Sequence, residues 1–140
     1  MLLLLDTHVW VWTVEGEQRR VGRRTRRLIA LAESREALRV SPASVFEIAA
    51  LHTKGRLRLA RPPEQWVHNA LEVSRVRLVD LSVAIAIDAG CIPHTAVADP
   101  MDRLLVATAR QLDATFLTRD AAILRYASKT GNVLVHDAAA

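Results

Sequence analysis

The chain has 140 residues, enough for one domain with a real core and too few for two ordinary domains, so we expect a single domain over residues 1–140. Hydrophobic residues make up 51% and charged residues 24%, which excludes a disordered tail and a low-complexity linker. The single cysteine, Cys91, excludes an intramolecular disulfide framework and a zinc-finger site.

The formal net charge is +4, and all but two of the 19 basic residues are arginine. Arginine binds phosphate in a planar, two-pronged geometry, so this excess favours a polyanionic ligand such as nucleic acid. A genome biased toward G and C would produce the same excess, and both explanations stay open.

No run approaches the ~20 apolar residues that a membrane span needs. The opening leucine run stops at Asp6 and lacks the basic region and cleavage site of a signal peptide. We therefore expect a cytoplasmic protein with no membrane contact.

The first half of the chain begins with an apolar run, Leu2–Leu5, typical of a strand buried on both faces. A polar, arginine-rich stretch over 15–27 then leads into a helix that contains residues 28–32. Leu38–Val40 is predicted to be a second strand. Ser41 and the proline after it predict a helix start, and Gly55 ends that helix.

The second half alternates in the same way. The predicted elements are a helix from Pro62 to Val73, a strand over Val76–Val79, a short helix over Val83–Ala89, a long helix from Asp99 to Leu112, a strand over Thr115–Thr118, a helix over Asp120–Ala127 and a strand over Asn132–Val135. Alternating strands and helices imply crossover connections. We therefore predict an α/β fold with a mainly parallel sheet of about five strands and helices on both faces.

Five acidic residues have routes to one edge of this sheet, where ligands bind beyond the carboxyl ends of parallel strands. Asp6 follows the first strand and Asp120 lies just after the fourth. Asp99 and Asp102 begin the long helix, and Glu47 lies one turn into the helix after the second strand.

Four of the acids also have an ordinary structural interpretation. Asp99 and Asp120 fit helix N-caps, and Asp102 suits a first turn, where the helix dipole favours negative charge. Glu47 fits a solvated helix position or a capping pair with Ser44.

Asp6 is the hardest to explain structurally, because a carboxylate at the end of an apolar strand is costly to bury without compensation. Two carboxylates ~4 Å apart repel by about 4 kcal/mol at an effective dielectric near 20, so a cluster of four requires cations. Hard divalent ions such as Mg²⁺ or Mn²⁺ prefer oxygen ligands and retain waters. Such a pocket would hold a phosphate and an attacking water.

Competing motifs are absent: the chain has no P-loop, no dinucleotide-binding glycine motif and no serine nucleophile elbow. A phosphatase with Asp6 as nucleophile lacks its usual second acid, because His8 stands two positions on. The five histidines show no zinc spacing, and we interpret them as surface or structural residues.

Five segments in order resemble the PIN-domain ribonucleases, and among them the VapC toxins of bacterial toxin–antitoxin pairs. The segments are Leu2-Leu-Leu-Leu-Asp6-Thr7-His8-Val9-Trp10, Ser41-Pro-Ala-Ser44-Val-Phe-Glu47-Ile-Ala, Lys54-Gly55-Arg-Leu57, Asp99-Pro-Met-Asp102-Arg103-Leu-Leu-Val-Ala-Thr-Ala109 and Phe116-Leu-Thr118-Arg-Asp120. The likeness runs from about Leu2 to Val135.

The resemblance implies a three-layer α/β/α PIN-like fold and a set of site residues. The implied catalytic acids are Asp6, Glu47, Asp102 and Asp120, the implied Mg²⁺ or Mn²⁺ ligands are Asp6, Asp102, Asp120 and Asp99, and the residues beside them are Thr7 and Thr118. Asp99 fits either a ligand or a helix cap. The family's usual histidine just before Asp-Pro is absent, since Val97 and Ala98 stand there, and we assign His94 no catalytic role.

The activity implied is a metal-dependent endoribonuclease that cleaves RNA by attack of water and leaves a 5′-phosphate. Arg103 and Arg119 are candidate phosphate-binding residues, although Arg103 equally fits a pairing with a neighbouring acid. The arginines at 19, 20, 23, 24, 26 and 27 fit an RNA track or a solvated helix face.

The implied partners are an RNA substrate, a VapB-like antitoxin and a second copy of the chain in a homodimer. Trp10, Trp12 and Trp66 fit such an interface, and core packing is their more ordinary role. The alternative function is a non-catalytic RNA- or protein-binding module that retains the fold.

Overall fold

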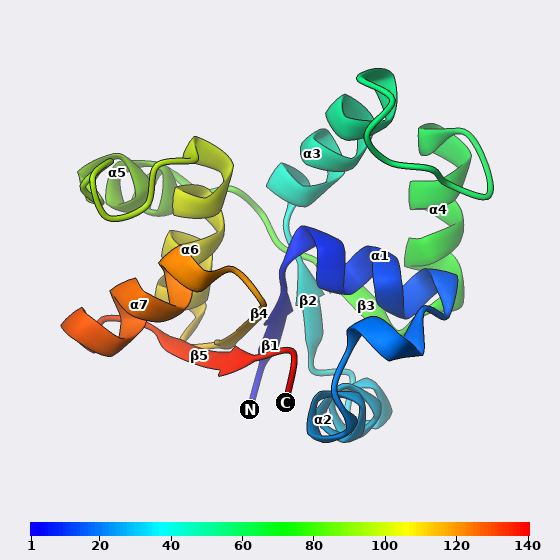
Figure 1. Ribbon diagram of the computed structural model, residues 1–140, viewed down its shortest axis with the longest axis horizontal. Helices are drawn as coiled ribbons and strands as arrows, with labels where there is room; N and C mark the ends of the chain where they lie inside the picture. The colour runs from blue at the N-terminus through cyan, green and yellow to red at the C-terminus, as the bar shows by residue number, and fades with distance from the viewer.

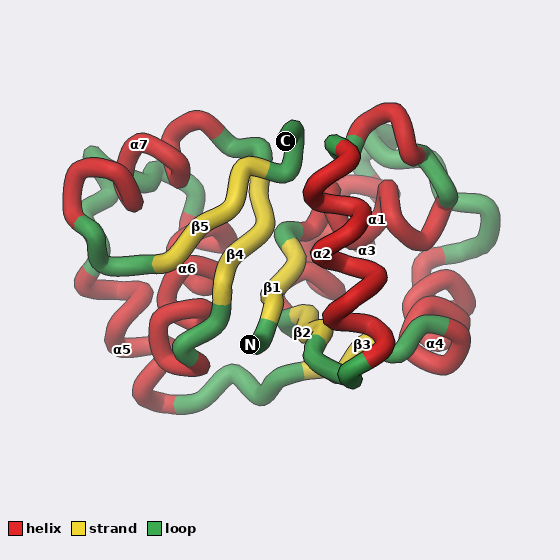
Figure 2. Tube along the Cα trace, turned by 90° about the horizontal axis from the view of Figure 1, so that it is seen from below, coloured by secondary structure: helices red, strands yellow, loops and turns green.

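The computed structural model describes residues 1–140. Five strands form one parallel sheet with the order β3-β2-β1-β4-β5 (Figure 2). Their bounds are β1 Leu3–Leu5, β2 Leu38–Val40, β3 Val76–Leu78, β4 Thr115–Thr118 and β5 Leu134–Asp137. The predicted parallel sheet of about five strands is confirmed.

Seven α-helices and one 3-10 turn connect the strands. Their bounds are α1 Thr7–Glu15, η1 Gln18–Arg20, α2 Arg23–Ser34, α3 Pro42–Thr53, α4 Pro63–Val73, α5 Val83–Cys91, α6 Pro100–Leu112 and α7 Ala121–Thr130. Figure 1 shows α1 to α4 on one side of the sheet and α5 to α7 on the other, which confirms the three-layer α/β/α fold. None of these helices has the length and apolar character that a bilayer crossing requires.

Alternating side chains of β1 contribute to two separate cores, as expected of a strand that is covered on both faces. Leu3 and Leu5 pack in the cluster formed with α1, α2 and α4. Leu4 packs in the second cluster with α6 and α7. All three leucines are almost fully buried. The central strand is therefore fixed from both sides, and so is the position of the residue that follows it.

Two of the three tryptophans belong to the first core. The rings of Trp10 and Trp66 meet edge to face with centroids 5.3 Å apart, and both side chains are buried. The Trp66 Nε1–H donates a hydrogen bond to Glu15 Oε1 at 2.8 Å. Core packing is confirmed for these two residues, whereas Trp12 is only partly buried.

The N-terminal helices differ from the sequence-based prediction. Residues 7–15 form α1, which was not predicted, and α2 begins at Arg23 within the stretch assigned to a polar lead-in. Asp6 caps α1 and Gly16 ends it in a left-handed conformation with φ of 72°. The β-branched residues of α1 obscured its helical periodicity, and the arginines of α2 are good helix formers that occupy its solvent face.

One strand boundary and one capping assignment also differ from the sequence-based prediction. β5 runs over Leu134–Asp137, two residues beyond the predicted Asn132–Val135. The capping pair of Glu47 with Ser44 is wrong, because Ser44 lies inside α3 and Ser41 caps that helix by accepting a hydrogen bond from the Ala43 N–H at 3.0 Å.

The order of the strands creates a switch point between β1 and β4. From β1 the chain proceeds to β2 and β3 on one side, and it later returns to β4 and β5 on the other. In open parallel sheets, a crevice forms beyond the carboxyl ends of the strands where the direction of winding changes. The residues that follow β1 and β4 therefore border this crevice.

Candidate metal centre

The five acids singled out from the sequence line one pocket of about 280 Å³ at the carboxyl edge of the sheet. This acidic pocket is lined by Asp6, His8, Val9, Trp12, Glu47, Asp99, Asp102, Arg119 and Asp120. Residues that follow β1 and β4 thus meet residues of α1, α3 and the start of α6 at the switch point. The structure brings together side chains that lie more than one hundred positions apart in the chain.

Three of the acids are close enough to bind one ion. A carboxylate oxygen from each of Glu47, Asp99 and Asp102 lies within 4.8 Å of the corresponding oxygen of the other two. Glu47 and Asp102 are partly buried, and Asp99 is exposed. Asp6 and Asp120 complete the wall of the same pocket.

Asp6 is fixed by hydrogen bonds at both carboxylate oxygens. Its Oδ1 accepts from the Thr7 N–H at 2.7 Å, which caps α1, and its Oδ2 accepts from the Thr118 hydroxyl at 2.6 Å. Burial raises the pKa of Asp6, although these two hydrogen bonds act in the opposite direction. The carboxylate is therefore oriented, and these hydrogen bonds offset only part of the cost of burying its charge.

Thr118 links two of the acids. Its buried hydroxyl donates to Asp6 and accepts from the Asp120 N–H at 3.0 Å, while Asp120 Oδ1 caps α7 by accepting from the Ile123 N–H at 3.0 Å. A single hydroxyl at the end of β4 thus sets the spacing of acids from two neighbouring strands. The expected position of Thr118 beside the acids agrees with this contact.

The side chain of Thr7 contacts a neighbouring helix. Its hydroxyl donates to Ser44 Oγ at 2.9 Å, and both side chains are fully buried. The only hydrogen bond from Thr7 to an acid comes from its backbone N–H to Asp6. Thr7 therefore ties α1 to α3, the helix that carries Glu47.

Asp99 and Asp102 combine a position at the start of a helix with a position in the acidic pocket. Asp99 caps α6 through its Oδ1, which accepts from the Met101 N–H at 2.8 Å, and Asp102 lies in the first turn. Both also line the acidic pocket. The positive end of the α6 dipole stabilises negative charge there, so helix capping and pocket formation reinforce each other.

The electrostatics of the pocket are strongly unfavourable to negative charge. Burial, together with the charges of Asp6, Asp99, Asp120 and Glu47, raises the pKa of Asp102 to about 8. None of the five acids forms a salt bridge with lysine or arginine. The carboxylates are therefore brought together without an internal cation.

This donor set fits a hard divalent cation. All the candidate ligand atoms are carboxylate oxygens, which Mg²⁺ and Mn²⁺ prefer over the nitrogen and sulfur ligands that softer metals take. A divalent charge would offset the repulsion that raises the pKa of Asp102. The residues present are thus suited to such an ion both in chemistry and in charge.

The two arginines expected to contact phosphate have different positions. Arg119 lines the acidic pocket and is exposed. Arg103 is partly buried and donates from Nη1 to the Val97 carbonyl at 3.2 Å, away from the pocket lining and without an acidic partner. Arg119 is therefore the better placed of the two.

Sequence reasoning missed two residues of the pocket wall, His8 and Trp12. They lie four positions apart on α1, so they share one face of the helix, and their rings have centroids 5.8 Å apart. The spacing of four positions between His8 and Trp12 indicates a shared helix face near Asp6. This spacing is informative only once a helix is known to begin directly after the first strand.

Comparison with known proteins agrees with this architecture. The family model of the PIN domain matches residues 3–129 of the chain. Ribonuclease VapC22 of Mycobacterium tuberculosis is 33% identical over 118 residues, which cover 84% of this chain and 86% of that protein.

Two solved structures share the fold over nearly the whole chain. DNA-bound VapBC from Salmonella typhimurium is similar with a TM-score of 0.66, 19% identity and coverage of 98% of both chains. VapBC2 from Rickettsia felis, bound to a DNA fragment from its promoter, is similar with a TM-score of 0.67, 16% identity and coverage of 97% of this chain and 98% of that one.

The raised pKa of Asp102 predicts how stability depends on pH when no metal is bound. A carboxyl with a folded pKa above its ordinary value stabilises the fold at low pH, and this contribution is lost as pH rises from 3.8 toward about 8. We expect the unfolding midpoint in urea with EDTA to fall between about pH 5 and about pH 8.5, and Asp102→Asn to reduce that fall.

Asp113→Asn is the matched control, because Asp113 is exposed at the C-cap of α6 and lies outside the pocket. Addition of Mg²⁺ should raise the midpoint of the wild-type protein most at the higher pH, where the carboxylates are ionised. A wild-type protein whose midpoint in EDTA falls no more over this interval than that of Asp102→Asn contradicts the prediction.

Proposed function

Because this chain belongs to the PIN-domain family, we propose that it is a divalent-metal-dependent endoribonuclease that acts as the toxin of a toxin–antitoxin pair. The family match and the relative named as a ribonuclease support an activity on RNA phosphodiesters. The observation that carries the proposal is the convergence of five acids on one pocket in which the pKa of Asp102 is raised to about 8. Such a pocket destabilises the fold, so a structural role alone does not explain it.

Asp6, Asp99, Asp102 and Asp120 would hold Mg²⁺ or Mn²⁺ in the acidic pocket that all four line. Asp99 and Asp102 also belong, with Glu47, to the three acids whose carboxylate oxygens lie within 4.8 Å of one another. When bound, the cation supplies Lewis-acid stabilisation of the phosphate and activates water for hydrolysis. Two of these acids are held in place by the hydroxyl of Thr118, so the ligand geometry is fixed before the substrate arrives.

The chain's own residues have three tasks in the reaction. A carboxylate accepts the proton of the attacking water, and Glu47 is suited to this because it is only partly buried at the pocket wall. The acids orient that water against the phosphorus. As the new P–O bond forms, the bond to the 3′ oxygen breaks, and that oxygen takes a proton from solvent and leaves as a hydroxyl, which gives a 5′-phosphate product. Arg119 at the rim contacts phosphate oxygens of the RNA.

We propose two protein partners. The similar solved structures are of VapBC assemblies, which supports a VapB-like antitoxin as the partner of this chain in the cytoplasm. A basic segment of that antitoxin would match the negative charge of the acidic pocket.

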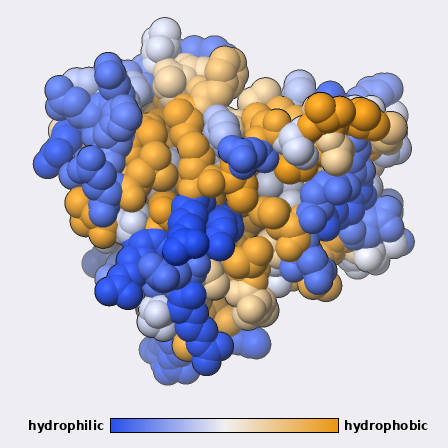
Figure 3. Space-filling model, turned by 180° about the vertical axis from the view of Figure 1, so that it is seen from behind, coloured by the Kyte–Doolittle hydropathy of each residue, from blue (hydrophilic) through white to orange (hydrophobic).

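The second partner is another copy of the chain in a homodimer. Helix α5 exposes Val83 and Ile87, four residues apart, with 77% and 64% of their surface accessible. Figure 3 shows apolar side chains gathered over a broad part of the rear face of the molecule. Exposed apolar surface of this kind is typical of protein interfaces.

Removal of one carboxylate tests the proposed activity. Asp6→Asn retains the helix cap but removes charge from the pocket, and we expect at least a ~100-fold loss of kcat/KM on RNA with Mg²⁺. Wild-type cleavage should stop with EDTA and return with Mg²⁺ or Mn²⁺, and Asp113→Asn should cleave like the wild type. Cleavage that survives both EDTA and Asp6→Asn would falsify the proposal.

The Thr118 hydroxyl is predicted to act through metal binding. Thr118→Val removes the bridge between Asp6 and Asp120 at nearly constant volume, so we expect ~10–100-fold weaker Mg²⁺ affinity. Thr118→Ser retains the hydroxyl and should restore most of that affinity. Calorimetric titration with Mg²⁺ measures this directly, and equal affinities for Val and Ser variants would contradict the assignment.

Light scattering tests the homodimer. We expect a particle of twice the 15.5 kDa chain mass, and Ile87→Asp on α5 should shift it toward the monomer. Val73→Asp is the control, because Val73 is 76% accessible at the end of α4, on the other side of the sheet (Figure 1). A monomeric wild type at micromolar concentration excludes the homodimer.

A further inference from the structure

Two arginines lie against one tryptophan at the rim of the acidic pocket. The Cζ atom of Arg119 is 5.6 Å from the centroid of the Trp12 ring, and that of Arg20 is 5.7 Å away. These distances are typical of cation–π contacts, which hold a guanidinium in a defined orientation. Trp12 thereby connects Arg119, which follows β4, with Arg20 from the turn after α1.

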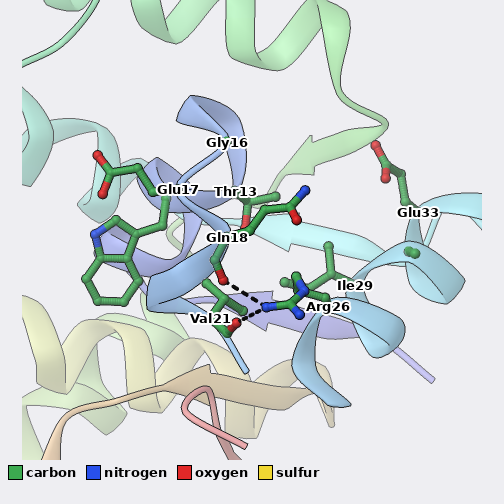
Figure 4. A pocket seen from close by; sticks show the side chains of 10 residues that line it. Thr13, Gly16, Glu17, Gln18, Val21, Arg26, Ile29 and Glu33 are labelled. Carbon is green, nitrogen blue, oxygen red and sulfur yellow. Dashed lines mark hydrogen bonds between the residues drawn. The ribbon is translucent and has the colours of Figure 1, made fainter. Parts of the chain in front are cut away.

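The backbone of this turn is anchored from two directions. Arg119 Nη1 donates to the Arg20 carbonyl at 3.1 Å. From α2, Arg26 Nη1 donates to the Gln18 carbonyl at 2.8 Å and also to that of Val21 (Figure 4). The segment that carries Arg20 is therefore fixed between two arginines, and its position does not depend on Arg20 itself.

Most of the donors of these two arginines remain free. A guanidinium has five N–H donors, and Arg119 uses one of them within the protein. Arg20 pairs through Nε with Glu17 at 2.9 Å, an exposed contact between side chains that are 60% and 48% accessible and one that contributes little energy. Both guanidinium groups thus present unpaired N–H donors to solvent.

Arg20, Arg119 and Trp12 form a positively charged rim beside the acidic pocket. Trp12 and Arg119 line the acidic pocket, but neither Arg119 nor Arg20 forms a salt bridge with any of its five acids. The positive charge is therefore not used to neutralise the pocket. It lies next to the pocket, within reach of the chain that flanks a phosphodiester bound there.

We propose that Arg119 and Arg20, oriented by Trp12, bind a backbone phosphate of the substrate strand that neighbours the cleaved phosphodiester. This inference rests on the proposed ribonuclease function and assigns that site a second phosphate subsite. Arginine stacked on an aromatic ring keeps its N–H edge available for bidentate contact with phosphate, so Trp12 is a positioning residue.

Binding by an inactive protein tests the subsite separately from cleavage. In the Asp6→Asn background, a single-stranded 12-nucleotide RNA should bind ~10-fold more weakly after Arg119→Ala, and the slope of log affinity against log salt should decrease by ~0.7 for each lost phosphate contact. Arg119→Lys should recover part of the affinity. Arg75→Ala is the control, because Arg75 is exposed at the amino end of β3.

Trp12 is tested by coupling to Arg119. Trp12→Leu should weaken RNA binding, and Arg119→Ala added to it should cost less than it does alone, whereas Trp12→Phe should retain most of the affinity. Because Trp10 and Trp66 are buried, RNA should change the tryptophan fluorescence through Trp12, and Trp12→Phe should abolish that change. Circular dichroism confirms that each variant is folded before its affinity is measured.

In the active enzyme, Arg119→Ala should raise KM ~10-fold with kcat within about twofold of wild type, since the neighbouring phosphate is held equally in the ground and transition states. A fall in kcat at constant KM would place Arg119 at the cleaved phosphate and overturn the proposal. Unchanged RNA affinity in the inactive Arg119→Ala protein would also overturn it. Absence of cleavage by wild type, with affinity still dependent on Arg119, would refute the nuclease function and leave the phosphate subsite intact.

Discussion

The repulsion among carboxylates at one edge of the sheet is the interaction on which the rest of this structure depends. Burial and four neighbouring acids raise the pKa of Asp102 to about 8, and no lysine or arginine pairs with any of the five. A protein interior rarely retains such an arrangement, because every ionised carboxylate adds to the cost of the next. The fold must hold these groups together rigidly enough that only an added cation relieves the repulsion.

That rigidity comes from the same local structure that builds the fold. Asp6, Asp99 and Asp120 each begin a helix, and their side-chain oxygens accept backbone hydrogen bonds at 2.7 Å, 2.8 Å and 3.0 Å. Thr118 then joins the first and last of these caps across β1 and β4. The strand order places this contact at the switch point, so sheet topology, helix capping and pocket geometry have one common origin.

Much of this arrangement could be predicted from the sequence, because its causes are local. The apolar run of Leu2–Leu5 followed by Asp6 marked the central strand and its edge, and the proline after Asp99 marked the start of α6. The spacing of the motifs was sufficient to predict the fold and to identify the five acids that meet in the pocket. Helix α1 was missed because its β-branched and aromatic residues do not show a clear helical periodicity. His8 and Trp12 were missed for the same reason, because their place in the pocket depends on that helix.

What could not be predicted is the set of contacts made between distant segments. Thr7 was expected beside the acids, and its hydroxyl contacts Ser44 on another helix. Arg103 fitted either a phosphate contact or a pairing with a neighbouring acid, and in the structure it donates to the Val97 carbonyl and forms no salt bridge. Such choices are decided by packing over a few ångströms, and no pattern of residue types records them.

The double use of Asp6, Asp99 and Asp120 as helix caps has an evolutionary consequence. Asparagine offers the same side-chain oxygen and is as good a cap as aspartate, so replacement at these positions spares the helix termini while it removes charge from the pocket. Aspartate and asparagine codons differ by a single base. A lineage under selection to inactivate this protein can therefore reach a well-folded, inactive variant by one substitution. That variant would keep the same outer surface and would still bind the partners that recognise this surface.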